Sequence, residues 1–245
     1  MSLENTVALI TGGSRGIGKA IVEALAKEKA RVTFTYNRSE KEAADLEKRT
    51  GATAIKLDVR NVTKTAEEIN KIYTSLGNID LLVNNAGVYF RNELLDSTEE
   101  IWDTTLDTNL KGSYFTAKAA IPKMSKKGMI INIASDAGVK SRGIEYGITK
   151  IAMIYLTKAL SLALNPNIRV NCICPSYTDT DMAAWNQGLG SKEEIERIHG
   201  INKPEDVAKA VISLAESEHN GRIVIIKGGK MMYTSGNPKD NFWLF

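Results

Sequence analysis

Cysteine and histidine are scarce in this chain of 245 residues, which has two of each. Cys172 and Cys174 alternate with apolar residues in IRVNCICP, so on a strand they would share one face. A disulfide between them would strain an extended backbone, and we expect two buried thiols instead. His199 and His219 are isolated from other ligand types. The sequence therefore predicts neither a disulfide framework nor a metal site.

Long apolar runs and a strong excess of one charge are also missing. No uncharged apolar segment approaches the length of about 18 residues that a membrane span needs, and MSLENTVALITGG lacks the pattern of a secretory signal. The 32 basic and 29 acidic residues give a net charge of +3 and are interleaved along the chain. We expect a cytoplasmic protein that binds neither membrane nor nucleic acid.

What the chain does have is an alternation of short β-branched runs with longer segments of helical period. Such alternation is typical of a parallel sheet covered by helices on both faces. With 43% hydrophobic residues and no linker or repeat, the chain fits one α/β domain over residues 1–245. The doubly wound sheet is predicted to contain seven parallel strands, at 6–11, 31–36, 53–59, 80–86, 129–135, 168–175 and 222–228.

Polar or glycine-rich residues follow six of these runs, among them GGSRGIG, NNAG and PSYTDT. Ligands of doubly wound sheets bind outside the carboxyl ends of the strands, so these segments predict one shared site. In TGGSRGIG, at 11–18, Gly12 allows a sharp turn, whereas Gly16 and Gly18 let a pyrophosphate approach the start of a helix. A glycine turn that binds nothing is the alternative.

Two segments share the spacing YxxxK, YFTAK at 114–118 and YGITK at 146–150. Only the second follows a strand end that carries a hydroxyl, Ser135. On a helix Tyr146 and Lys150 would lie on one face, so the ammonium group, together with an oxidised nicotinamide if one binds nearby, is expected to lower the pKa of the phenol. Tyr114 lies within a helical segment, which favours packing or an interface.

TGGSRGIG, NNAG at 84–87, Asn109, Ser135 and YGITK, in this order, resemble the short-chain dehydrogenase/reductase family over nearly the whole chain. The resemblance implies a Rossmann-type fold, a homotetramer, and hydride transfer between a nicotinamide cofactor and a carbonyl or secondary alcohol. It also implies that Ser135 binds the substrate oxygen, Tyr146 donates a proton and Lys150 orients the ribose. Asn109 would hold a water for proton relay, although an ordinary helix asparagine is the alternative.

The second predicted strand ends in TYNRSE, without the acid that would bind the 2′-hydroxyl of NAD(H). Arg15 and Arg38 favour the 2′-phosphate, so we expect NADP(H), with NAD(H) as the alternative. Arg38 could instead begin a solvated helix with Glu42. The expected cofactor contacts, including an adenine pair at 58–59 and a nicotinamide segment at 175–180, are Gly12, Ser14, Arg15, Gly16, Ile17, Gly18, Asn37, Arg38, Asp58, Val59, Asn85, Ala86, Gly87, Tyr146, Lys150, Pro175, Thr178 and Thr180.

Within the family, NRSE, NNAG and NLKG are most similar to the 3-oxoacyl-acyl-carrier-protein reductases, which implies a small carbonyl or alcohol substrate on a carrier. A sugar or polyol dehydrogenase is the enzymatic alternative, and a non-catalytic, cofactor-binding regulatory protein is the other. Ser176 departs from the family, because glycine often follows this proline. The apolar end, Phe242 to Phe245, is expected to pack on a neighbouring subunit or on the rim of the pocket.

Overall fold

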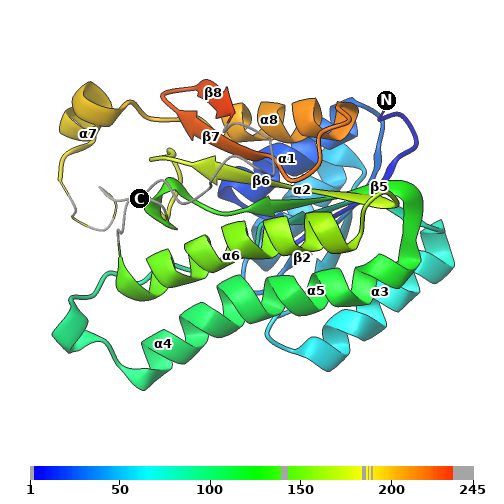
Figure 1. Ribbon diagram of the computed structural model, residues 1–245, viewed down its shortest axis with the longest axis horizontal. Helices are drawn as coiled ribbons and strands as arrows, with labels where there is room; N and C mark the ends of the chain where they lie inside the picture. Colours follow the sequence, from blue (N-terminus) through cyan, green and yellow to red (C-terminus); the bar gives the residue numbers. More distant parts are fainter. Residues whose placement is uncertain (1–2, 139–142, 184–185, 187, 189, 234–245) are drawn as a thin grey trace.

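The β-branched runs form one sheet, with strand order β3-β2-β1-β4-β5-β6-β7-β8 (Figure 1). The computed structural model describes residues 3–138, 143–183, 186, 188 and 190–233, so the predicted contacts of Phe242 to Phe245 lie outside the described residues. The strands are β1 (Val7–Ile10), β2 (Arg31–Tyr36), β3 (Thr53–Lys56), β4 (Ile79–Asn84), β5 (Met124–Ile133), β6 (Ile168–Pro175), β7 (Ile223–Lys227) and β8 (Lys230–Tyr233). The first seven pair in parallel, which confirms the predicted doubly wound sheet.

The eighth strand is an addition to the prediction. β8 pairs antiparallel with β7 and ends the sheet beyond the parallel strands. The two residues between β7 and β8, Gly228 and Gly229, have φ angles of 53° and 73°. Two consecutive positive φ angles are what a tight hairpin turn requires, and glycine adopts them without steric cost.

Helices cover both faces of the sheet, as the alternation of the sequence predicts (Figure 1). Along β1, Ala8 and Ile10 face the core beneath α1, α2 and α8, whereas Leu9 faces the core beneath α3 and α5. The long helices are α1 (Gly16–Lys27), α2 (Glu40–Thr50), α3 (Val62–Leu76), α4 (Glu99–Leu106), α5 (Ser113–Ala120), α6 (Ile144–Ala163), α7 (Lys192–His199) and α8 (Pro204–Glu216). Short helical turns are η1 (Leu94–Asp96), η2 (Asp107–Gly112), η3 (Ile121–Lys123) and η4 (Asp136–Gly138), and η2 is a π-helix.

The two cysteines lie together in the core beneath α6. Cys172 and Cys174 are both free and buried, with their sulfur atoms 3.8 Å apart on one face of β6. This confirms the prediction of two buried thiols. None of the described helices combines the length and apolar character needed to cross a bilayer.

Candidate active site

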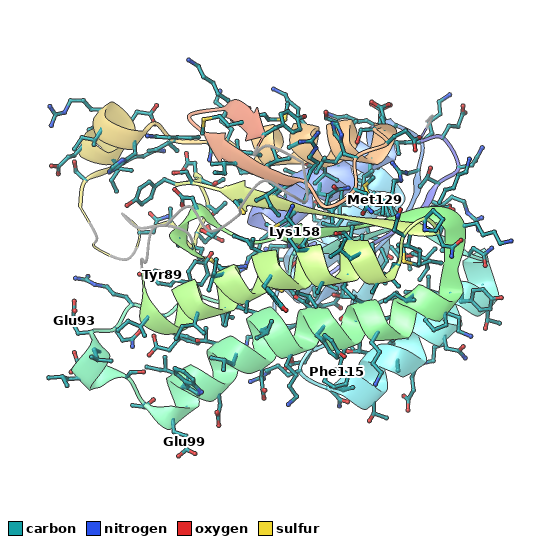
Figure 2. The ribbon with its side chains drawn as sticks, in the orientation of Figure 1. Tyr89, Glu93, Glu99, Phe115, Met129 and Lys158 are labelled. Carbon is teal, nitrogen blue, oxygen red and sulfur yellow. The ribbon has the colours of Figure 1, made fainter. Side chains whose placement is uncertain are left out.

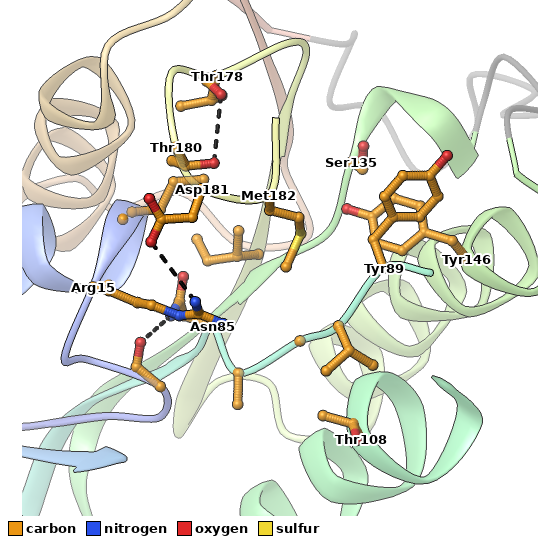
Figure 3. Close-up of a pocket in the computed structure, with 18 of the residues that line it drawn as sticks. Arg15, Asn85, Tyr89, Thr108, Ser135, Tyr146, Thr178, Thr180, Asp181 and Met182 are labelled. Carbon is orange, nitrogen blue, oxygen red and sulfur yellow. Dashed lines mark hydrogen bonds and ion pairs between the residues drawn. The ribbon is translucent and has the colours of Figure 1, made fainter. Parts of the chain in front are cut away.

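A cavity of about 760 Å³ runs along the carboxyl ends of strands β1 to β6 (Figure 3). Its size is that of a typical site for a cofactor or small molecule. The sheet reverses its order between β1 and β4, so the cavity occupies the switch point of the fold. All of the predicted site residues line this cavity except Asn109.

One end of the cavity is formed by the glycine turn between β1 and α1. A Cβ atom on Gly18 would lie 2.2 Å from the carbonyl oxygen of Gly12, and one on Gly13 would lie 2.5 Å from Cβ of Phe34. Both distances are too short for a side chain. The absence of side chains brings the backbone and the N-terminus of α1 to the cavity wall, which is the arrangement that binds a phosphate.

Asn85 and Thr11 fasten this turn to the end of β4. The side-chain amide of Asn85 donates to the carbonyl oxygens of Thr11 and Gly12, at 2.9 Å each. Thr11 Oγ1 in turn accepts from the backbone amides of Asn85 and Ala86, at 3.0 Å each. The amide of Asn85 therefore shapes the glycine turn, a role that its predicted place beside the cofactor did not include.

The charges at the ends of β2 and β3 are arranged around Asp58. Its carboxylate accepts from Arg60, with Nη2 2.6 Å and Nε 3.0 Å away, and from Nδ2 of Asn37 at 3.1 Å. The hydrogen bond from Arg60 is the main reason that the pKa of Asp58 is lowered. Arg38 is exposed at the same end. Arg15 lies across the cavity, 3.7 Å from Asp181 (Figure 3).

Ser135, Tyr146 and Lys150 meet in the middle of the cavity. Tyr146 and Ser135 are hydrogen bonded to each other, and Ser135 Oγ also accepts from the amide of Ala137 at 3.1 Å. The Lys150 ammonium is 5.3 Å from the centre of the Tyr146 ring and donates to the carbonyl oxygen of Ile133 at 3.0 Å. The spacing YxxxK thus places both side chains of YGITK beside a hydroxyl.

The prediction that the pKa of the Tyr146 phenol is lowered is wrong for the polypeptide. Burial raises this pKa to about 12, because a phenolate is poorly solvated there, and the hydrogen bond from Ser135 opposes the rise only in part. Asp136 adds to the rise with its negative charge. Burial also lowers the pKa of Lys150 from 10.5 to about 8, which weakens it as a source of positive charge.

Asn109 lies in the π-helix η2, behind the cavity wall. Its Oδ1 accepts from the amide of Val88 at 2.8 Å, and its Nδ2 donates to the carbonyl oxygen of Val88 at 3.0 Å and to Oγ1 of Thr149 at 3.1 Å. A Cβ atom on Gly87 would lie 3.3 Å from Asn109 Oδ1 and 3.7 Å from Lys150 Nζ. Asn109 therefore anchors the loop after β4, and its role in a water relay stays a prediction.

Tyr114 lies on α5 and does not line the cavity. The residue is 44% exposed, and its ring packs edge-on against Phe115, with centroids 5.2 Å apart. This placement separates YFTAK from the site, as predicted.

Sequence reasoning missed four large side chains that line the cavity. They are Tyr89, Phe90, Tyr177 and Met182. The Tyr89 ring packs against Tyr146 with centroids 5.1 Å apart at 63°, and Met182 lies between Asp181 and Tyr89 (Figure 3). Tyr89 and Phe90 form an aromatic pair soon after NNAG, which is the signal that could have identified this wall.

The segment after β6 forms the remaining wall. Thr178 Oγ1 donates to the carbonyl oxygen of Ser176 at 3.0 Å, and Thr180 Cγ2 lies 3.2 Å from the position of a Cβ atom on Gly16. Pro175, Thr178 and Thr180 line the cavity, and their place beside the nicotinamide stays a prediction. The hydroxyl of Ser176 is buried and has no hydrogen-bond partner among the described residues.

Comparisons with known proteins place this site in a family. The family model described as short chain dehydrogenase matches residues 6–188. 3-Oxoacyl-[acyl-carrier-protein] reductase FabG of Chlamydia muridarum is 34% identical, over 93% of this chain and 98% of its own length. Dehydrogenase/reductase SDR family member 4 of Homo sapiens is also 34% identical, over 93% of this chain and 88% of its own.

Two solved structures show the same architecture. A short chain dehydrogenase from Burkholderia cenocepacia in complex with NADP has a TM-score of 0.86 and 32% identity, over 94% of this chain and 99% of that one. A glucose/ribitol dehydrogenase from Brucella melitensis has a TM-score of 0.87 and 28% identity, over 93% and 97%.

Proposed function

Because the chain belongs to the short-chain dehydrogenase family, we propose that this oxidoreductase uses NADP(H) to reduce a carbonyl group to a secondary alcohol. The observation that carries the proposal is the meeting of Ser135, Tyr146 and Lys150 in the same cavity as the glycine turn. A dinucleotide held by the turn would extend along this cavity toward the three side chains.

The cavity fits a phosphorylated dinucleotide. Gly13 and Gly18 allow the turn to pack closely on Phe34 and on its own backbone, and this close packing places the N-terminus of α1 at the cavity wall, where a pyrophosphate could bind. The carboxylate of Asp58 is neutralised by Arg60, Arg38 is exposed at the same end, and Arg15 faces it from across the cavity, so a 2′-phosphate would meet positive charge. The unpartnered hydroxyl of Ser176 would find a hydrogen-bond partner in a ligand at the other end. The Burkholderia relative was solved with NADP.

The proposed chemistry divides between hydride and proton. NADPH, when bound, supplies the hydride. Ser135 donates a hydrogen bond to the substrate oxygen, and Tyr146 transfers its phenolic proton to the same atom. Since burial raises the pKa of Tyr146 to about 12, the phenol is protonated at neutral pH and suited to act as the acid. Lys150 adjusts the acidity of Tyr146, from 5.3 Å away.

We propose a 3-oxoacyl thioester on a carrier as the substrate. The cavity presents large aromatic and aliphatic side chains from Tyr89, Phe90, Tyr177 and Met182, which suit an acyl chain better than a polyhydroxyl compound. The relatives named FabG support the same class. A sugar or polyol is the competing substrate, given the Brucella relative.

We also propose that the protein is a homo-oligomer, with a tetramer implied by the family. Large apolar side chains are exposed on α4, α5 and α6, where Trp102 is 40%, Tyr155 70% and Leu162 71% exposed. Association would bury these side chains. Sedimentation of the purified chain measures the assembly directly.

The proposal is tested with a substrate panel and two matched variants. Acetoacetyl thioesters, aldoses and polyols are assayed with NADPH and with NADH, and the expected result is rapid reduction of the thioesters with NADPH. Tyr146→Phe should lower kcat by about 10³-fold through loss of the proton donor, while the Kd for NADPH is unchanged. Tyr114→Phe removes the same atom from the other YxxxK segment and should retain native kinetics.

Native turnover by Tyr146→Phe would overturn the assignment of the proton donor. Tight binding of NADPH without turnover of any compound in the panel would instead support a non-catalytic binding protein.

A further inference from the structure

Residues 88–98 form most of the connection between β4 and α4, and their first part lines the cavity. Apart from η1, this loop has no helix or strand to hold it in place. Its first residue is held by Asn109, which binds both the amide and the carbonyl of Val88. A loop that is fixed only at its start would leave the wall free to move, so the contacts further along the loop decide its position.

Two of those contacts come from Glu145, in the first turn of α6. Its Oε1 accepts from Nδ2 of Asn92 at 3.2 Å and from Oγ of Ser97. The side chain is buried, with 5% of the residue exposed. Burying a carboxylate is costly unless donors surround it, and here both donors belong to the loop. Glu145 therefore ties the middle and the end of the loop to the helix.

The carboxylate is ionised at neutral pH. The hydrogen bond from Ser97 is the main cause that lowers the pKa of Glu145, and it outweighs the opposing effect of burial. The position of Glu145 at the N-terminus of α6 also favours a negative charge. Hydrogen bonds to an ionised acceptor are stronger than neutral ones, so this clamp is worth more than two ordinary contacts.

Between the two anchors lies Tyr89, against the residue that follows Glu145. The Tyr89 ring packs on Tyr146 with centroids 5.1 Å apart, beside the first turn of α6 (Figure 2). A Cβ atom on Gly143 would lie 3.2 Å from Cε2 of Tyr89, so this glycine leaves little space on that side of the ring. Two consecutive residues of α6 thus hold the same loop, Glu145 by hydrogen bonds and Tyr146 by ring contact.

We infer that Tyr89 determines which acyl groups the cavity accepts, and that Glu145 is a positioning residue that keeps the Tyr89 ring against Tyr146. This inference rests on the proposed carbonyl reduction, because it names the part of the cavity that receives the substrate. Tyr89 acts as a fixed wall, and Glu145 acts through the loop without touching the reacting atoms. Substrates branched or bulky next to the carbonyl are those that a fixed ring excludes.

The kinetic test compares a branched 3-oxoacyl thioester with acetoacetyl thioester. In Glu145→Gln the clamp loses its charge, the Tyr89 ring gains freedom, and the ratio of kcat/KM for the branched over the straight substrate should rise about tenfold. KM for the straight substrate should rise about threefold through loss of orientation, with kcat unchanged. Ser97→Ala should shift the ratio in the same direction by a smaller factor.

The decisive comparison is made in the Tyr89→Ala background. Removing the ring should raise the ratio by itself, and Glu145→Gln should then add nothing, because the wall that it positions is gone. An equal effect of Glu145→Gln with and without the ring would overturn the inference, as would an unchanged ratio in the native background. A general loss of stability would not produce this dependence on Tyr89.

The chain offers a matched control at the start of β5. Ser125 Oγ donates to Oδ1 of Asp80, as Ser97 Oγ does to Glu145, but neither Ser125 nor Asp80 belongs to the loop 88–98 or to α6. Ser125→Ala removes a serine-to-carboxylate hydrogen bond of the same kind and should leave the substrate ratio unchanged. A shift in that variant equal to the shift in Ser97→Ala would remove the support for a local clamp.

A measurement without substrate separates this inference from the proposed function. Amide hydrogen exchange in residues 88–98 should be faster by about tenfold in Glu145→Gln than in the native chain, and unchanged in Ser125→Ala. Native exchange in Glu145→Gln would overturn the clamp even if carbonyl reduction is confirmed. If no carbonyl compound is reduced, the proposed function fails, and the exchange experiment still decides whether Glu145 holds the loop.

Discussion

Asp136 directly follows Ser135 and is buried in the wall of the cavity. Its negative charge disfavours ionisation of Tyr146, as do Tyr89 and Cys174, while Lys150 lies over the ring from α6. Oxidation of an alcohol needs the phenolate, because the phenol must then accept the proton. In the proposed reaction, Asp136 would therefore favour the protonated phenol that carbonyl reduction needs.

The first prediction concerns this charge. Asp136→Asn should lower the pKa of Tyr146 and move the pH profile of alcohol oxidation to lower pH, with oxidation at pH 8 faster by about threefold. Rates from pH 6 to 10 measure the shift. Asp103→Asn, at an exposed position of α4, serves as the control and should leave the profile in place. A shift to higher pH in Asp136→Asn would contradict the assignment.

Lys150 provides a second prediction, on stability. In the fold its pKa is about 8, below the ordinary 10.5, so burying the ammonium costs free energy at every pH where it is charged. The cost is fully present below pH 8 and fades as the pH rises toward 10.5. Lys150→Met should raise the free energy of unfolding at pH 7 by roughly 1–3 kcal/mol and abolish turnover.

Urea denaturation at pH 7 and at pH 10 measures both the gain and its decline. Tyr146 does not affect the free energy of unfolding near pH 8, where the cost of burying Lys150 begins to fade. The pKa of its phenol is about 12 in the fold and 10 ordinarily, so Tyr146 contributes only above about pH 10. If the increase in the free energy of unfolding caused by Lys150→Met were larger at pH 10 than at pH 7, the lowered pKa of Lys150 would be contradicted.

At this scale the sequence predicted which residues meet but not their surroundings. The spacing YxxxK predicted that Tyr146 and Lys150 lie on one face of a helix. The polar residues that follow the predicted strands predicted which residues line the cavity. The pKa of Tyr146 depends on how deeply its ring is buried and on interactions with residues far along the chain, Tyr89 and Cys174 among them. Residue spacing carries no information on that burial.

Among the elements, the glycine turn owes its shape to β4 as much as to its own glycines. Asn85 Nδ2 donates to the carbonyl oxygens of Thr11 and Gly12 and so links the turn to the end of β4. Asn85→Ala should loosen the turn and raise the Kd for NADPH by about tenfold, with a lower melting temperature. Calorimetric titration measures the Kd. Unchanged affinity would show that the turn holds its shape without Asn85.

Strand prediction succeeded where β-branched runs were long and failed for β8. Lys230 to Tyr233 contains no β-branched residue, so period and propensity gave no signal. The Gly-Gly pair before it is a recognised hairpin signal and would have identified the turn. The π-helix around Asn109 could not be predicted, because it depends on tertiary contacts with Val88 and Thr149.

The described residues form one sheet with helices on both faces. We propose that residues 1–245 unfold as a single domain. A dinucleotide that binds the folded chain stabilises it by mass action, by about 2.7 kcal/mol at a concentration of 100 times its Kd. Thermal unfolding should show one transition, raised by roughly 5–10 °C with NADP⁺ at this concentration, and raised less by an equal concentration of NAD⁺.

Arg38 supplies the control for that experiment. Arg38→Ala should weaken stabilisation by NADP⁺ and leave that by NAD⁺ unchanged, because only the first carries a 2′-phosphate. Lys41→Ala removes a positive charge from an exposed position of α2 and should preserve the difference between the two nucleotides. Equal stabilisation by both nucleotides in the native chain would contradict the preference for NADP(H).

The ion pair between Arg15 and Asp181 joins the glycine turn to the segment after β6 across the mouth of the cavity. Both side chains are more than half exposed, so ions from the solvent screen their attraction, over a Debye length of about 8 Å at 0.15 M ionic strength. The tightness of the mouth is therefore set partly by the medium. At low ionic strength the attraction between Arg15 and Asp181 holds the glycine turn close to the segment after β6, and at high ionic strength the two segments can separate. The rate of nucleotide exchange should therefore rise with ionic strength.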